Sequence, residues 1–553
     1  MNRAPASDQT ALPRWLGVLF AACAAIWLIG LGFRGLFNPD EGRYAEIPRE
    51  ILASGDWVIP HLNGLVYIEK PPLQYWATAI SEALFGQNAW AARLYTGLCA
   101  LATVAALWAM IRRQWGGVAA ARAAIMLGSS LLFVLLGQQL LLDMSLTLYM
   151  TLTLVGFCNA QRSERWQGWM LLSWAGISGA FLTKGLIAGV LPLFTLIVYS
   201  TLQRDPAPWR RLLLGRGAAL FALLCLPWLI LIQHRLPQFF QFFFVREHFQ
   251  RFLTKIEDRY QPWWFFIPIL VAGILPWLVP ALRSLCADWR GTIARPGFDA
   301  RRFAWIWCVV IFVFFSASDS KLLSYILPMF PALALLMATS PTVRLNADLR
   351  ATGAGMTVVG VLLLLGAAFL PRILYETILY DPHTAPYFIH IRPALILMGA
   401  CSLGGGIAAW RVRPDGIRPT LAVGVAGFAT WAGALWAAAI VAPLYSGSAL
   451  YAQLPVSLRQ GVPVYSVRTY DQSLTFYLRH PVTLVDYRGE LDFGQTLEPN
   501  RSIASLADFA PRWRDSAQAL AVIERKTYEQ MRSEGFPMVI RANSPKSYIV
   551  SRR

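Results

Sequence analysis

Long apolar runs recur along the chain as far as residue 444, and they constrain its fold more than any other feature. A helix needs roughly 20 apolar residues to cross a bilayer, and most of these runs approach that length. Of the 553 residues, 56% are hydrophobic and 14% are charged, whereas about 25% are charged in soluble domains. We therefore predict an all-α polytopic membrane bundle of about thirteen transmembrane helices within 1–444, at 15–36, 90–111, 118–137, 144–160, 166–183, 185–202, 217–233, 263–282, 303–316, 322–340, 353–370, 393–410 and 421–444.

Arginine clusters occupy alternate loops between these runs, and loops that stay in the cytoplasm are the ones rich in Lys and Arg. The loops 37–89 and 234–262, and everything after 444, are then predicted on the outer side. The net charge of +18 is spread over many separate loops instead of one face, so we expect no nucleic-acid partner.

The first outer loop carries the densest polar motif. Asn38-Pro39-Asp40-Glu41-Gly42-Arg43-Tyr44 follows the first apolar run, and Glu69-Lys70-Pro71-Pro72 comes later in the same loop. A carboxylate at a membrane edge is costly to desolvate, so Asp40 and Glu41 should face water, Arg43 or a polar ligand. We interpret this loop as the active site.

Other polar residues converge on the same side of the membrane. The stretches 44–53 and 73–84 have helical spacing and are expected to lie in the membrane interface and to cover a cavity. Asp143 and Lys184 mark the outer ends of their spans. Either residue alone would be interpreted as an interface residue whose side chain snorkels to the headgroups, but their convergence favours a shared site.

The loop 234–262 is aromatic and basic and should lie on the outer leaflet. Arg246 and Arg251 are candidates for phosphate binding because guanidinium groups bind phosphate bidentately. His248 is either a structural hydrogen-bonding residue or a ligand that ties this loop to Glu69 through a divalent metal.

The short turn 316–325 places Lys321 at a helix start, where the helix dipole disfavours a cation unless an anion is near. Either Asp319 supplies that anion or a ligand phosphate does. Tyr325 follows in the same segment.

After residue 444 the pattern changes to that of a soluble α/β domain, residues 445–553. It contains no nucleotide-binding loop, nucleophile elbow or metal-ligand spacing, so a supporting or docking role is the default. The predicted strands are 464–467, 482–486, 519–523, 537–540 and 548–550, and the predicted helices are 472–477 and 526–532.

Four stretches, namely 38–47, 55–57, 69–76 and 320–328, resemble the aminoarabinose transferases of lipid A. They are similar, more loosely, to protein O-mannosyltransferases and other C-type glycosyltransferases. The resemblance implies a C-type glycosyltransferase fold in the bacterial inner membrane. It also implies that 4-amino-4-deoxy-L-arabinose passes from undecaprenyl phosphate to lipid A phosphates at the periplasmic face, by a monomer in contact with membrane lipids.

Under this resemblance, we expect Asp40 to position the sugar and stabilise an oxocarbenium-like centre, and Lys70 to meet the departing phosphate. Asp143 is the third predicted catalytic residue, and direct attack by the acceptor predicts inversion. A divalent metal would be held by Glu69 and His248. The predicted substrate-binding residues are Glu41, Arg43, Tyr44, Lys184, Arg246, Arg251, Lys321 and Tyr325.

Two alternatives remain open at this point. One is a protein O-mannosyltransferase-like enzyme that uses another polyprenyl-phosphate sugar. The other is a lipid transporter or flippase, but transporters usually place ionisable groups near the bilayer midplane. Here the polar motifs lie at one outer face, which favours an enzyme.

Overall fold

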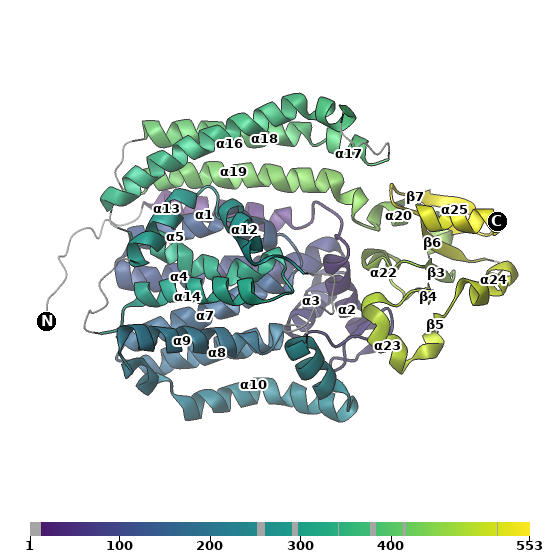
Figure 1. Ribbon diagram of the computed structural model, residues 1–553, viewed down its shortest axis with the longest axis horizontal. Helices are drawn as coiled ribbons and strands as arrows, with labels where there is room; N and C mark the ends of the chain where they lie inside the picture. Colours follow the sequence, from purple (N-terminus) through teal and green to yellow (C-terminus); the bar gives the residue numbers. More distant parts are fainter. Residues whose placement is uncertain are drawn as a thin grey trace.

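The computed structural model describes residues 13–250, 260–289, 297–340, 342–376, 383–412, 416–459, 461–516 and 518–553. The long helices lie side by side in one bundle, and the C-terminal domain packs against one end of it (Figure 1). Helices α2 and α3 lie at the junction between the two parts.

Each predicted apolar run coincides with a helix or with consecutive helices of the bundle. Six described helices are long and apolar enough to cross a membrane, or seven if the pair α5 and α6, bent by 67°, forms one span. The count of about thirteen stays a prediction. The bundle consists of α1 (Arg14–Gly30), α4 (Ala89–Trp115), α5 (Gly117–Gly128), α6 (Leu131–Gly137), α7 (Leu142–Arg162), α8 (Trp166–Lys184), α9 (Ile187–Gln203), α10 (Leu214–Arg235), α12 (Phe266–Gly273), α13 (Leu278–Trp289), α14 (Ala300–Ala317), α15 (Phe330–Ala338), α16 (Thr342–Glu376), α18 (Arg392–Arg411) and α19 (Arg418–Val441).

Small residues let the bundle helices approach closely. A Cβ at Gly360 on α16 would lie 2.6 Å from the backbone nitrogen of Leu403 on α18, so only glycine fits there. Membrane helices associate through this kind of contact because lipid gives them no hydrophobic driving force. Helices α16, α18 and α19 form one side of the bundle, and α8, α9 and α10 form the opposite side (Figure 1).

The first outer loop folds into α2 (Asp40–Ser54), a two-stranded hairpin of β1 (His61–Leu62) and β2 (Leu65–Val66), and α3 (Leu73–Phe85). The helices agree with the sequence prediction, but α2 does not lie in an exposed interface. Its residues 41–51 are buried, because it packs against α3 and against α22 (Gln472–Leu478) of the C-terminal domain.

The C-terminal domain holds a six-stranded sheet in the order β5-β4-β3-β6-β8-β7, parallel from β5 to β6 and antiparallel at β8 and β7. Every strand predicted from the sequence overlaps an observed one, whereas β5 and the helices α20, α21 (Val456–Arg459), α23 and α24 were missed. The strands are β3 (Val464–Val467), β4 (Thr483–Val485), β5 (Ser502–Ile503), β6 (Leu520–Glu524), β7 (Val539–Asn543) and β8 (Ser547–Ser551); the helices include α20 (Ser448–Gln453), α23 (Asp492–Leu497), α24 (Leu506–Asp515) and α25 (Arg525–Ser533).

One apolar core joins this domain to the first outer loop. Ile47 of α2 and Tyr75 of α3 belong to the same buried cluster as Leu474 of α22 and Leu484 of the sheet. The other sheet face has a separate core around Trp513. Because α2 shares its core with the domain, the position of its first turn depends on both parts of the protein.

Candidate active site

A cavity of about 240 Å³ opens at the end of the bundle beneath α2. Its wall combines carboxylates, cations and phenols from several segments that are far apart in the sequence. The polar and charged residues that line it are Asn38, Asp40, Glu41, Arg43, Tyr44, Glu69, Lys70, Gln139, Asp143, Lys184, Ser324 and Tyr325. The structure thus brings together most of the residues singled out from the sequence.

Asp40 is the first residue of α2, where the helix dipole favours a negative charge. Its Oδ1 lies 3.4 Å from Nη1 of Arg43, and its side chain is 38% exposed. Tyr44, one turn along the helix, is buried, and this burial raises the pKa of its hydroxyl well above the usual range. Tyr44 is therefore a neutral hydrogen-bond donor beside an accessible carboxylate.

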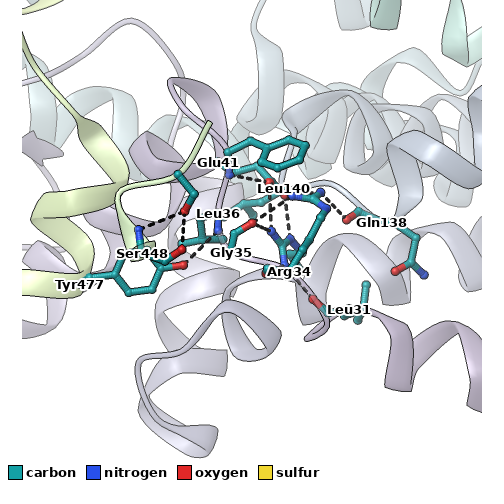
Figure 2. Close-up of polar contacts among 12 residues, drawn as sticks. Leu31, Arg34, Gly35, Leu36, Glu41, Gln138, Leu140, Ser448 and Tyr477 are labelled. Carbon is teal, nitrogen blue, oxygen red and sulfur yellow. Dashed lines mark hydrogen bonds and ion pairs between the residues drawn. The ribbon is translucent and has the colours of Figure 1, made fainter. Parts of the chain in front are cut away.

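Glu41, the next residue, is held by a different set of partners. Its carboxylate forms ion pairs with Arg34 and Arg93, and it accepts hydrogen bonds from the backbone N–H groups of Phe37 and Leu140, both at 2.9 Å (Figure 2). Burial acts to raise the pKa of Glu41, but the two guanidinium groups outweigh it and hold that pKa well below the usual range. These contacts engage both carboxylate oxygens of Glu41, which was predicted as a substrate-binding residue. Through them Glu41 connects α2 to the segment that follows α1, to α4 and to the turn at Gln139.

Lys70 lies between the main cavity and a smaller adjoining pocket of about 120 Å³. Its Nζ donates to the backbone carbonyl of Glu69 at 2.9 Å and lies 3.5 Å from Oε2 of Glu247. The Lys70 side chain is 18% exposed, so its ammonium group is accessible from the cavity. A cation in this position can meet an anionic group entering from either pocket.

Asp143 and Lys184 form an ion pair across the cavity wall. Asp143 lies in the first turn of α7 and Lys184 in the last turn of α8, and each charge suits the helix end that carries it. The Lys184 ammonium also lies 4.3 Å from the ring centre of Tyr325, a cation–π contact.

Two of the predicted cationic residues, Lys321 and Arg246, do not line this cavity. Lys321 is buried, and its Nζ donates to the backbone carbonyls of Ser318 and of Gln261, the latter at 2.8 Å. These backbone oxygens surround the ammonium group together with the nearby charge of Asp319, and the role of Lys321 in binding a ligand phosphate stays a prediction. Arg246 is exposed and stacks on Phe242 at 5.2 Å from the ring centre.

The remaining predictions fall where the structure gives no side-chain positions. Arg251 lies outside the described residues, and so does the side chain of His248. Within the described part of the chain, no three His, Cys, Asp or Glu side chains gather closely enough to hold a metal ion. The role of Glu69 and His248 as metal ligands stays a prediction.

Four residues that matter to the site were missed from the sequence. Arg34 and Arg93 hold Glu41, Glu247 pairs with Lys70, and Glu490 of the C-terminal domain pairs with Arg43. The first two had a signal, because each is a charge at the outer end of an apolar run on the side of Asp40. Glu490 had none, since it lies more than four hundred residues from its partner.

Comparison with known proteins agrees with this geometry. Residues 450–552 match the aminoarabinose transferase C-terminal domain family, and residues 69–231 match the dolichyl-phosphate-mannose-protein mannosyltransferase family. An undecaprenyl phosphate-α-4-amino-4-deoxy-L-arabinose arabinosyl transferase from Pseudomonas fluorescens is 36% identical over 382 residues, 67% of this chain and 63% of that protein. A relative of the same name from Pseudomonas aeruginosa is 35% identical over 407 residues, 71% of each chain.

The same likeness extends to three dimensions. The crystal structure of ArnT from Cupriavidus metallidurans bound to undecaprenyl phosphate superposes with a TM-score of 0.89 at 32% sequence identity, and the match covers 98% of this chain and 99% of that one. A bundle of this kind, with its polar cavity at one end, defines an integral inner-membrane glycosyltransferase. More particularly, the chain belongs to the family of undecaprenyl phosphate-α-4-amino-4-deoxy-L-arabinose arabinosyl transferases.

Proposed function

We propose that this enzyme transfers 4-amino-4-deoxy-L-arabinose from undecaprenyl phosphate to phosphate groups of lipid A. The observation that carries the proposal is the cavity at the end of the bundle, which gathers Asp40, Lys70 and the Asp143–Lys184 pair. The family membership names the sugar and the carrier. The distribution of arginines along the sequence supports a periplasmic position for the cavity.

The reaction breaks the bond between the anomeric carbon and the oxygen of the carrier phosphate, and an oxygen of the acceptor phosphate forms the new bond. Negative charge accumulates on the departing lipid phosphate, and Lys70 is the cavity cation that meets it. The acceptor phosphate is already anionic at neutral pH, so it needs no general base to attack.

Asp40 therefore has a different task from that of a base. Its exposed carboxylate binds the ammonium group of the aminosugar and stabilises the positive charge that develops at the anomeric carbon. Attack from the face opposite the leaving phosphate inverts the anomeric configuration. Asp143 holds Lys184 over Tyr325 and keeps that wall of the cavity in place.

The proposed product changes the charge of the cell surface. Each transfer adds an amine beside a lipid A phosphate and lowers the negative charge of the outer surface, which weakens the attraction of cationic peptides such as polymyxin.

The direct test uses purified protein in detergent with the undecaprenyl-phosphate-linked aminosugar and lipid A. Mass spectrometry should detect lipid A heavier by one aminopentose per transfer, and NMR of the product should show the inverted linkage. Detergent abolishes transport across a membrane, so a flippase gives no product. A failure of the purified, folded protein to modify lipid A would contradict the proposed function. Retention of the anomeric configuration in the product would contradict the proposed mechanism.

A further inference from the structure

The first turn of α2, which carries Asp40, is held by the C-terminal domain as well as by the bundle. Asn38 donates from Nδ2 to Asp471 at 2.7 Å and accepts from the backbone N–H of Ser473 at 2.8 Å. A Cβ at Gly42 would lie 2.3 Å from the same Ser473 nitrogen, so only glycine permits this contact. The domain thus touches the catalytic turn on two sides.

The same domain also supplies a carboxylate to the site. Glu490, in a short turn of 3-10 helix (Gly489–Leu491), forms an ion pair with Nη2 of Arg43 and accepts a hydrogen bond from Gln472 at 2.5 Å. Arg43 presents its other terminal nitrogen to Asp40 at 3.4 Å. One buried guanidinium is therefore shared between two carboxylates from the two parts of the protein.

The two partners of Arg43 differ in accessibility. The side chain of Glu490 is 14% exposed, whereas that of Asp40 is 38% exposed and lines the cavity. Without the charge of Glu490, Arg43 would have Asp40 as its nearest carboxylate, and a full ion pair would form between them. That pair would neutralise Asp40 and direct it away from the sugar.

We propose that Glu490 is a positioning residue for sugar transfer, because it holds Arg43 against the C-terminal domain and so leaves the Asp40 carboxylate directed into the cavity. The domain is then a part of the active centre, beyond the supporting role that its sequence suggested. This inference rests on the proposed function.

The test compares the full-length Glu490→Gln protein with wild type, using the purified donor and lipid A. We expect kcat to fall at least tenfold while KM for either substrate changes less than twofold. Glu490→Asp should recover part of the rate. The matched control is Glu534→Gln, which should leave kcat unchanged, since Glu534 is exposed at the end of α25 and accepts a hydrogen bond from Gln530 of its own domain.

A double-mutant cycle separates positioning from general damage. If Glu490 acts through Arg43, Glu490→Gln should cost little further activity in an Arg43→Gln background, whereas an equal loss in both backgrounds overturns the inference. Should Glu490→Gln fail to fold, Gln472→Ala removes the hydrogen bond that orients Glu490 and should lower kcat at least threefold. An unchanged kcat in the folded Glu490→Gln protein refutes the positioning role of Glu490 and leaves the proposed function standing. An inactive wild-type protein refutes the proposed function itself.

Discussion

Asp40 and Glu41 are neighbours in α2 and both line the cavity, yet their carboxylates lie in two different regions. Glu41 belongs to a saturated cluster with Arg34 and Arg93, and its side chain is 3% exposed. Asp40 faces the cavity, where its side chain is 38% exposed and its arginine partner is 3.4 Å away. The difference teaches that a carboxylate whose oxygens are fully engaged by the protein stabilises the fold, whereas one left partly solvated is available to a substrate.

The largest effect that would sharpen this comparison is on activity. Asp40→Asn removes the charge and keeps the shape, so we expect transfer to lipid A to fall about 10³-fold. Thermal unfolding in detergent should be nearly unchanged, because an exposed carboxylate contributes little to stability. Transfer activity and thermal unfolding are measured on the same purified sample. An Asp40→Asn protein that is markedly less stable than wild type would break the comparison.

The opposite pattern is expected of Glu41→Gln. Removing this charge leaves two buried guanidinium groups uncompensated, which destabilises a protein by about 3–5 kcal/mol. We expect a much lower unfolding temperature and a lower yield of folded protein. If Glu41→Gln unfolds like wild type and loses only its activity, then Glu41 belongs to the cavity region after all.

A third carboxylate site on α2 predicts a smaller, pH-dependent effect. Glu50 accepts from the backbone N–H of Gly64, and burial together with the charge of Glu46 raises its pKa to about 8, although Arg49 opposes this. Between about pH 4.5 and 8 the unfolded chain loses this proton while the folded protein keeps it, so the free energy of unfolding falls as pH rises.

Thermal unfolding scans between pH 5 and 9 should show this decline in wild type. Glu50→Gln imitates the protonated form and should flatten it. If unfolding temperature falls with pH equally steeply in wild type and in Glu50→Gln, then Glu50 is not the cause of the decline.

The smallest effect is expected at Arg246. It was predicted as a substrate-binding residue, but its guanidinium is exposed and stacks on Phe242 outside both regions. We expect Arg246→Ala to change kcat/KM by about twofold or less, as for most exposed charges. A tenfold loss in the same assay would place this loop in the substrate path.

The parts of the protein that could be predicted are those that depend on local sequence patterns. The apolar runs predicted the bundle helices, and short runs of β-forming residues predicted β3 and β6 of the C-terminal domain to within one residue. The short strand β5, of only two residues, lacked enough length to show a period. Asp40, Lys70 and Asp143 stood out because a charged side chain at a membrane edge is costly without a purpose.

Partners distant in the sequence could not be predicted, because pairing depends on how the helices pack. Nothing in the loop that contains Glu490 identified it as a partner of Arg43, and nothing near Lys321 in the sequence indicated that its ammonium group donates to the backbone carbonyls of Ser318 and Gln261.

The sequence by itself determined that the chain enters a membrane, and it predicted which loops share one side of it and which residues carry the charge for sugar transfer, since hydrophobicity and charge act residue by residue. Only the tertiary structure decided the division of labour between Asp40 and Glu41. Successive residues at the start of a helix face different directions, and what each one meets there is set by segments folded in from α1, α4 and the C-terminal domain.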